Sequence, residues 1–188
     1  MSTRIAPAVP PFSEAVEKRL AAVMPPGVPP LTLFTTLARN PRVFDRFMAG
    51  GLLDKGTLSL RQRELIIDRT CALCGSAYEW GVHVAFFGER VALTPEEIRA
   101  LAAEGPDAAC WTDDERLILR LVDQLHARQD IDDGLFAALK KSFAEEQLIE
   151  MIVLCGFYHT VSFVTNGLRI PLEAFGTPLP TPRAEARP

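Results

Sequence analysis

The chain has 188 residues, of which 48% are hydrophobic and 23% are charged, an ordinary balance for one globular domain with its own core. Its formal net charge of −4 argues against a nucleic-acid partner, which would need a basic surface. We find no apolar run of the roughly 18 to 20 residues that cross a bilayer, and no secretory signal. Because its four cysteines accompany no such signal, we expect reduced thiols and a soluble cytoplasmic protein that binds no membrane.

Helical patterns follow one another along the chain, and no segment has a convincing strand pattern. Seven of the fifteen prolines precede Leu31 and five follow Ile170. We therefore divide the chain into a proline-rich N-terminal arm with a short helix (residues 1–30), a helical domain (residues 31–170) and a proline-rich C-terminal tail (residues 171–188). The patterns predict helices over residues 12–23, 31–39, 41–53, 59–75, 76–88, 94–105, 112–128, 132–141 and 145–168.

The starts of several helices carry a capping box, in which a hydroxyl residue and a Glu or Gln three positions later satisfy free backbone N–H groups. Ser59, Thr94 and Thr112 each begin such a pattern. By the same rule, Ser76 and Glu79 predict a capping box at the start of the helix over residues 76–88.

Most of the chemically active side chains lie in residues 64–83, where two predicted helices meet at Gly75. Residues three, four or seven positions apart share one face of a helix. On the first helix this spacing joins Glu64, Asp68 and Cys71. On the second helix it joins Ser76, Glu79 and His83. If the two helices pack as an antiparallel hairpin, the first glutamate approaches the glutamate–histidine pair.

A set of spaced strings runs through the helical domain: Arg63-Glu64, YEWGVH at 78–83, LTPEEI at 93–98, WTDDER at 111–116 and EQLIE at 146–150. Together they resemble the carboxymuconolactone decarboxylase family, to which alkylhydroperoxidase D is related. The resemblance covers about residues 30–175. It implies an all-α, alkylhydroperoxidase D-like helical bundle built on a central helix hairpin. It also implies a homo-oligomer (dimer, trimer or hexamer) with active sites near subunit contacts.

The decarboxylase branch of this family resembles the chain in placing a glutamate four residues before the histidine, as in Glu79 and His83. The first hypothesis is therefore an enzyme that transfers protons on a small organic acid, lactone or related carbonyl compound. Glu79 and His83 would be the acid–base pair, and Glu64 would orient the histidine. The possible pocket residues are Ser76, Tyr78 and Tyr158, with either tyrosine as a hydroxyl donor.

A second hypothesis is a thiol peroxidase that uses Cys71 and Cys74. Measured from Glu64 and His83, the cysteines of the peroxidase branch would fall at Ser76 and Glu79, so its thiol pair is missing there. The Cys-x-x-Cys of this chain lies five residues upstream, near a helix C-terminus, where the helix dipole opposes a thiolate. A third hypothesis is an oligomeric binding protein without catalysis.

We expect no metal or cofactor from the sequence. A zinc site needs further ligands beside the Cys-x-x-Cys, and no second Cys-x-x-Cys or His-x-x-x-His is present. Cys110 and Cys155 are interpreted as structural, and His126 as a charge at a helix C-terminus. Either Tyr158 or His159 is expected to line the pocket. A further set of aromatic residues indicates core or subunit interface: Phe86, Phe87, Phe157 and Phe163.

Overall fold

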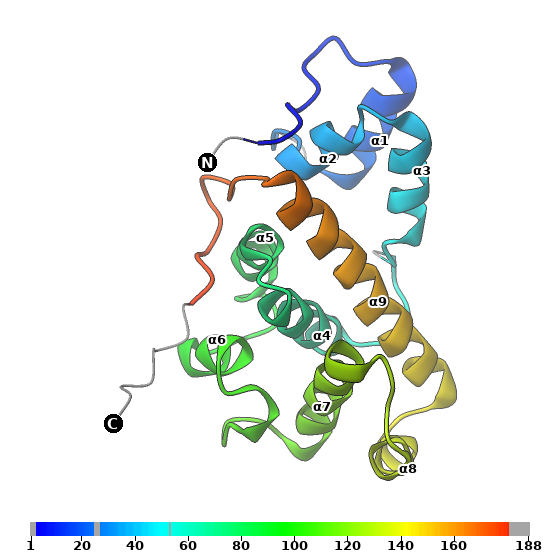
Figure 1. Ribbon diagram of the computed structural model, residues 1–188, viewed down its shortest axis with the longest axis vertical. Helices are drawn as coiled ribbons and strands as arrows, with labels where there is room; N and C mark the ends of the chain where they lie inside the picture. The colour runs from blue at the N-terminus through cyan, green and yellow to red at the C-terminus, as the bar shows by residue number, and fades with distance from the viewer. Residues whose placement is uncertain (1–2, 25–26, 53, 181–188) are drawn as a thin grey trace.

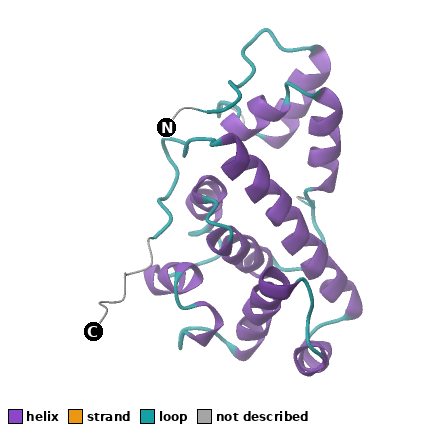
Figure 2. Cartoon of the chain, in the orientation of Figure 1, coloured by secondary structure: helices purple, strands orange, loops and turns teal. Residues whose placement is uncertain are grey.

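The computed structural model describes residues 3–24, 27–52 and 54–180, which form helices and loops without a strand (Figure 2). The helices are α1 (Glu14–Val23), α2 (Thr32–Leu37), α3 (Pro41–Gly50), α4 (Leu60–Leu73), α5 (Ala77–Phe87), α6 (Pro95–Ala102), the 3-10 helix η1 (Gly105–Asp107), α7 (Asp113–Arg128), α8 (Asp133–Ser142) and α9 (Glu145–Leu168). The all-α prediction is confirmed, with helix ends within three residues of those expected. The expected end of the third helix, residue 53, lies outside the described residues, as do parts of the predicted arm and tail.

Helix α4 lies at the centre and packs against α5, α6, α7 and α9 (Figure 1). Its residues Leu65, Ile66 and Ile67 are fully buried although they point in three different directions around the helix axis. A helix that is buried all round needs neighbours on every side. The polar residues that α4 brings into this core, among them Glu64, therefore need partners inside the protein.

The long helix α9 crosses the molecule between two groups of helices (Figure 1). Helices α1 to α3 lie beyond one side of its C-terminal half, whereas α4 and α7 contact it from the other. Side chains on α9 therefore meet different neighbours according to the direction in which they point. This arrangement keeps the polar residues around His83 apart from those around His126.

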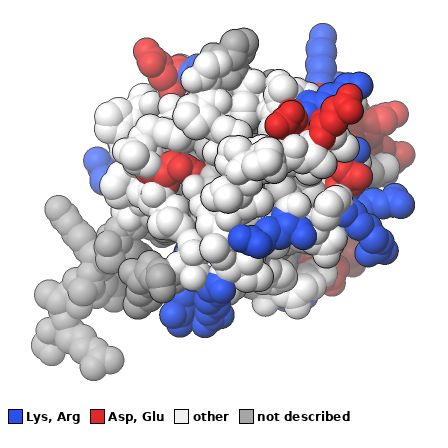
Figure 3. Space-filling view, turned by 90° about the horizontal axis from the view of Figure 1, so that it is seen from above, with Lys and Arg blue, Asp and Glu red and all other residues white. Residues whose placement is uncertain are grey.

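Helix α9 also corrects one expectation from the sequence, because it is long and apolar enough to cross a membrane by length and composition. In the structure, 44% of its most apolar window is buried against the rest of the chain. The core helix of a soluble protein passes the same test. On the face shown in Figure 3, acidic and basic side chains are interspersed and most of the surface is uncharged.

Three of the four predicted capping boxes are present, at Ser59, Thr94 and Thr112. The box predicted at Ser76 is wrong: this side chain makes no capping hydrogen bond to α5. Its hydroxyl instead lies 2.9 Å from the hydroxyl of Thr165 on α9. The reason is tertiary, since Ser76 is fully buried between helices and satisfies its hydroxyl across the interface.

Both ends of the described chain pack onto the helical domain. The Arg4 amide donates to the Leu168 carbonyl at 2.9 Å, and the Thr177 amide donates to the Gly81 carbonyl at 3.0 Å. A Cβ atom at Gly81 would lie 2.2 Å from Leu172, so glycine lets the C-terminal segment approach α5 this closely. The proline-rich segments are thus part of the folded unit where they are described.

Candidate active site

The two central helices bring Glu64 and His83 together inside the protein. Glu64 Oε2 lies 2.7 Å from His83 Nδ1, and Glu64 is fully buried. The hairpin turn at Gly75, where φ is +61°, reverses the chain between α4 and α5 and sets this approach. The second carboxylate oxygen, Oε1, accepts from Arg63 Nη2 at 3.1 Å. Glu64 is therefore held at both oxygens, and it fixes the orientation of the imidazole ring.

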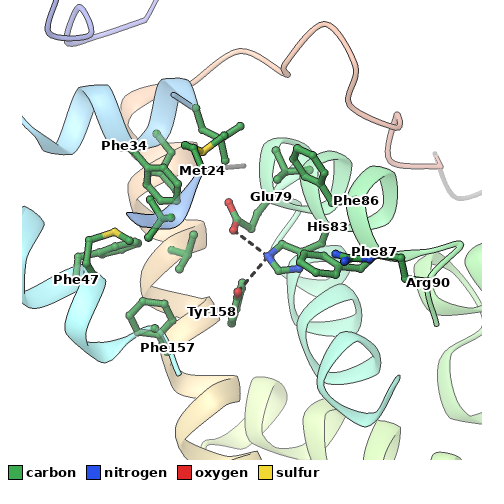
Figure 4. Close-up of a pocket in the computed structure, with 17 residues that line it drawn as sticks. Met24, Phe34, Phe47, Glu79, His83, Phe86, Phe87, Arg90, Phe157 and Tyr158 are labelled. Carbon is green, nitrogen blue, oxygen red and sulfur yellow. Dashed lines mark hydrogen bonds and ion pairs between the residues drawn. The ribbon is translucent and has the colours of Figure 1, made fainter. Parts of the chain in front are cut away.

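The other ring nitrogen of His83 faces α9 and the first turn of α5. His83 Nε2 lies 3.0 Å from the hydroxyl oxygen of Tyr158 and 3.4 Å from Glu79 Oε1 (Figure 4). The second oxygen of Glu79, Oε2, is buried and has no hydrogen-bond partner among the described residues. Such a group would gain free energy from a ligand that donates a hydrogen bond to it.

Glu79, His83 and Tyr158 line one wall of a cavity of about 290 Å³. Helices α2, α3, α5 and α9 enclose this space, and most of its lining is apolar. Its phenylalanines are Phe34, Phe47, Phe86, Phe87 and Phe157. Arg90 is the one Lys or Arg side chain among the described lining residues. An apolar cavity with a few polar groups on one wall is the usual form of a small-molecule site, and this volume fits a small ligand.

The charges around His83 favour its protonated form. Burial by itself lowers the pKa of His83, but the carboxylate of Glu64 and hydrogen bonds to Glu64 and Glu79 raise it to about 10. At neutral pH the ring is therefore an imidazolium that donates from both nitrogens. Tyr158 accepts one of these hydrogen bonds and keeps its own O–H for a ligand. Burial raises the pKa of Tyr158 well above its usual value, so this hydroxyl stays protonated.

Asp68 lies one helical turn from Glu64 and is almost fully buried. Burial, and then the nearby charge of Glu64, raise the pKa of Asp68 well above its usual value. The raised pKa favours the protonated, neutral form of Asp68 beside the charged Glu64. The sequence placed Asp68 on the correct helix face but did not indicate its raised pKa, which depends on burial.

Of the three possible pocket residues, Tyr158 lines the cavity, whereas Ser76 and Tyr78 lie outside the cavity formed by the described residues. The Tyr78 hydroxyl accepts from the Leu33 amide at 3.0 Å and donates to Glu173 at 2.7 Å. Tyr78 thus ties α2 to the C-terminal segment. Its position in the YEWGVH string carries no information about this long-range role.

The thiols of Cys71 and Cys74 also lie outside the cavity lining. Cys71 is fully buried, and burial raises the pKa of its thiol well above the usual value. Burial likewise raises the pKa of Cys74, which is half-buried at the C-cap of α4. Neither thiol has the stabilised thiolate that redox chemistry needs.

Nothing in the sequence indicated that several of these residues would line the cavity. Phe34 and Phe47 come from helices that the sequence places far from the central hairpin, and Arg90 follows α5 in a turn. Phe86, Phe87 and Phe157 were interpreted as core or interface, and the structure places them on the cavity wall. The helical period that marks an apolar face does not distinguish a packed core from a cavity wall.

A sequence profile of the carboxymuconolactone decarboxylase family matches residues 39–124. This segment contains Glu64, Glu79 and His83 and ends before α8. No protein with a curated description is significantly similar in sequence.

Solved structures with the same fold include two uncharacterized peroxidase-related proteins. The one from Ralstonia eutropha JMP134, an alkylhydroperoxidase AhpD core, has a TM-score of 0.78 at 19% identity, covering 92% of this chain and 95% of the other. The one from Silicibacter sp. TM1040 has a TM-score of 0.80 at 17% identity, covering 92% of each chain. A variant of the debrominase Bmp8 in complex with 2,3,4-tribromopyrrole has a TM-score of 0.69 at 16% identity, covering 93% and 94%. At these identities the likeness establishes the fold.

Proposed function

We propose that this chain, whose residues 39–124 match the carboxymuconolactone decarboxylase family, is an enzyme that transfers a proton on a small, mostly apolar organic acid, lactone or related carbonyl compound. One observation carries the proposal. A buried imidazolium, held from behind by Glu64, meets a carboxylate and a tyrosine hydroxyl on the wall of an apolar cavity.

The three groups at this wall have complementary roles. Glu79, as a carboxylate with one unpartnered oxygen, is the base that takes a proton from the carbon next to the substrate carbonyl. The electron pair of that C–H bond moves onto the carbonyl oxygen. Tyr158 donates its O–H to this oxygen as its negative charge develops, and the imidazolium of His83 stabilises that charge through its own hydrogen bond to Tyr158. Return of the proton from Glu79 to the same or a conjugated carbon completes an isomerisation or exchange.

The cavity also suggests how the substrate would bind. Its phenylalanines favour an apolar or aromatic body, and water excluded from such a site strengthens the hydrogen bonds within it. Arg90 lies at the wall with its guanidinium 5.6 Å from the Phe87 ring centroid, where it would pair with a substrate carboxylate. Glu64 lies behind His83 and does not line the cavity, so it is a positioning residue.

The thiol peroxidase hypothesis has weaker support. Peroxidase-related proteins share the fold, but Cys71 is fully buried here and burial raises the pKa of both thiols. The non-catalytic hypothesis would use the buried, unpartnered oxygen of Glu79 only to accept a hydrogen bond from a bound ligand, and it predicts no exchange of substrate hydrogen. Measurement of hydrogen exchange distinguishes both hypotheses from the proposed proton transfer.

The test is solvent hydrogen exchange, because it detects proton abstraction before the full reaction is known. The full chain is incubated in D₂O with a panel of small lactones and keto acids that carry apolar or aromatic bodies. Mass spectrometry then measures deuterium at the carbon next to the carbonyl. We expect Glu79→Gln to lower the exchange rate by about 10²- to 10⁴-fold, the usual contribution of a general base.

Glu89→Gln is the matched control, because Glu89 is exposed two residues beyond α5. The Glu89→Gln variant should catalyse deuterium exchange at the wild-type rate. The proposal fails if Glu79→Gln keeps full exchange, or if no compound in the panel exchanges while peroxide rapidly and reversibly oxidises Cys71 and Cys74. The second result would favour the thiol peroxidase.

A further inference from the structure

A second polar cluster lies where α4, α7 and α9 come together, away from the catalytic cavity. It consists of Cys74 at the C-cap of α4, His126 in the last turn of α7 and His159 on α9. All three side chains are half-buried, so water and small ions reach them. The sequence did not predict this cluster, because its members are 52 and 33 residues apart along the chain.

The distances within the cluster are close to those of a tetrahedral metal site. Cys74 Sγ lies 3.8 Å from His126 Nδ1, and His126 Nδ1 lies 3.0 Å from His159 Nε2. One ligand atom from each residue lies within 4.8 Å of the others. For zinc–sulfur and zinc–nitrogen bonds of about 2.3 and 2.05 Å at the tetrahedral angle, the S···N and N···N distances are about 3.6 and 3.3 Å. Each of these two pairs would have to shift by only a few tenths of an ångström to bind zinc.

The surroundings orient the donor atoms. His159 Nδ1 lies 2.9 Å from the backbone carbonyl of Cys155, to which it donates. Its proton is therefore on Nδ1, and Nε2 presents a lone pair to the cluster. A metal-bound histidine almost always donates its other N–H in this way. The amide of Asn166 donates to the carbonyl of Cys74 at 2.9 Å, which fixes the backbone of the third ligand.

The charges nearby permit a cation. Asp123 lies one turn before His126 on α7, and both of its oxygens are bonded to Arg69, at 2.7 and 2.9 Å. This neutral pair leaves no unpaired positive charge from that side against the cluster. A thiolate and two neutral imidazoles are ligands of borderline softness, which suits Zn²⁺ better than Mg²⁺ or Ca²⁺.

We propose that Cys74, His126 and His159 form a binding site for one Zn²⁺ ion, with water in the fourth position. On binding, the Cys74 thiol releases its proton to solvent, and the proton on His126 Nδ1 moves to its Nε2. Both imidazoles then coordinate in the neutral form. This site is independent of the catalytic proposal, because it shares no residue with the cavity wall.

The test uses the full chain with any affinity tag removed, after metal has been stripped with a chelator. Titration with Co²⁺ should give the thiolate-to-metal charge-transfer band and the intense visible bands of a tetrahedral ion, saturating at one ion per chain. Competition with a chromophoric zinc indicator gives the affinity for Zn²⁺. We expect Cys74→Ser, His126→Gln and His159→Gln each to weaken the affinity for Zn²⁺ by more than about 100-fold, beyond the 10- to 100-fold typical of residues that only hydrogen-bond to a metal ligand.

Matched controls exist for both residue types. Cys71→Ala and Cys110→Ser remove other thiols, and His83→Gln removes the remaining histidine of the chain. Each should bind Zn²⁺ within about threefold of wild type. The proposal is overturned if wild type shows no saturable binding, if His126→Gln and His159→Gln bind normally, or if binding is lost with Cys71→Ala or His83→Gln. Circular dichroism of each variant checks folding, and the two α7 and α9 variants decide the matter if Cys74→Ser fails to fold.

Discussion

His83 and His126 both contact α9, and their surroundings are electrostatically opposite. His83 meets Tyr158 in a fully buried site with carboxylates on two sides, and these raise its pKa to about 10. His126 meets His159 in a half-buried site, where burial and then the neighbouring histidine lower its pKa. One histidine is a permanent cation at neutral pH, whereas the other is a neutral donor–acceptor group.

The difference shows how one helix serves two kinds of chemistry. Tyr158 and His159 are consecutive residues of α9, so their side chains point about 100° apart around the helix axis. One direction leads into the apolar cavity and the other towards α4 and α7. The residues that pack against each histidine set its chemical role. The positive charge of His83 and the neutral state of His126 can therefore be changed independently by mutation.

The largest effect is expected when the buried ion pair between Glu64 and His83 is broken. Glu64→Gln leaves the imidazolium of His83 without its main counter-charge, and should lower the free energy of unfolding by about 3–5 kcal/mol. Chemical denaturation measures this loss. Glu89→Gln, at an exposed position, should change stability by less than about 0.5 kcal/mol. Equal stability of the two variants would contradict a charged His83.

The next largest effect is expected from a change to Tyr158, the residue of α9 that points into the cavity. Tyr158→Phe removes the hydroxyl that would stabilise the developing oxyanion and should lower the deuterium-exchange rate by about 10²- to 10³-fold. Because the ring remains, binding should change little, so the loss should appear in the maximal rate. Thr160→Ala, on the exposed face of the same helix, provides the control. An unchanged rate for Tyr158→Phe would remove this hydroxyl from the mechanism.

The two histidines should titrate at opposite ends of the pH range. NMR of the ring protons should give His83 a midpoint near pH 10 and His126 a midpoint below the ordinary value of about 6.5. Between pH 6.5 and 8 the unfolded chain loses the proton that folded His83 keeps. Stability should therefore fall with rising pH by about 1.4 kcal/mol per unit for this group.

The sign is opposite for His126. Below about pH 6.5 the unfolded chain gains a proton that folded His126 resists, so this group lowers stability as the pH falls. His126→Gln should remove that acid-side contribution and leave the alkaline slope intact. A His83 midpoint near 6.5 would remove the proposed imidazolium and with it the contrast between the clusters.

The smallest change in stability is expected at the cluster of Cys74, His126 and His159 in metal-free protein. His126→Gln breaks one neutral hydrogen bond to His159 and should cost about 0.5–1.5 kcal/mol in metal-free protein. The same denaturation experiment measures it beside Glu64→Gln. A loss as large as that of Glu64→Gln would mean that the second cluster also holds the fold together, and that the two regions do not differ as described.

Much of the fold follows from local rules that the sequence displays. The helix starts at Ser59, Thr94 and Thr112 are correct because a capping box is satisfied within four residues. The turn at Gly75 is correct because it requires a positive φ. The box at Ser76 has the same local pattern and is absent, because a buried hydroxyl found a partner on α9 instead.

The sequence by itself determined the all-α class and which residues share a helix face, because three- and four-residue spacing fixes these within one helix. It therefore placed Glu64 on one central helix and Glu79 and His83 on the other. Only the tertiary structure decided that Tyr158 rather than Tyr78 meets His83, 75 residues away. It also brought Cys74, His126 and His159 together and raised the pKa of Asp68. Contacts between distant segments and the pKa values that depend on burial arise from packing, and no local pattern encodes them.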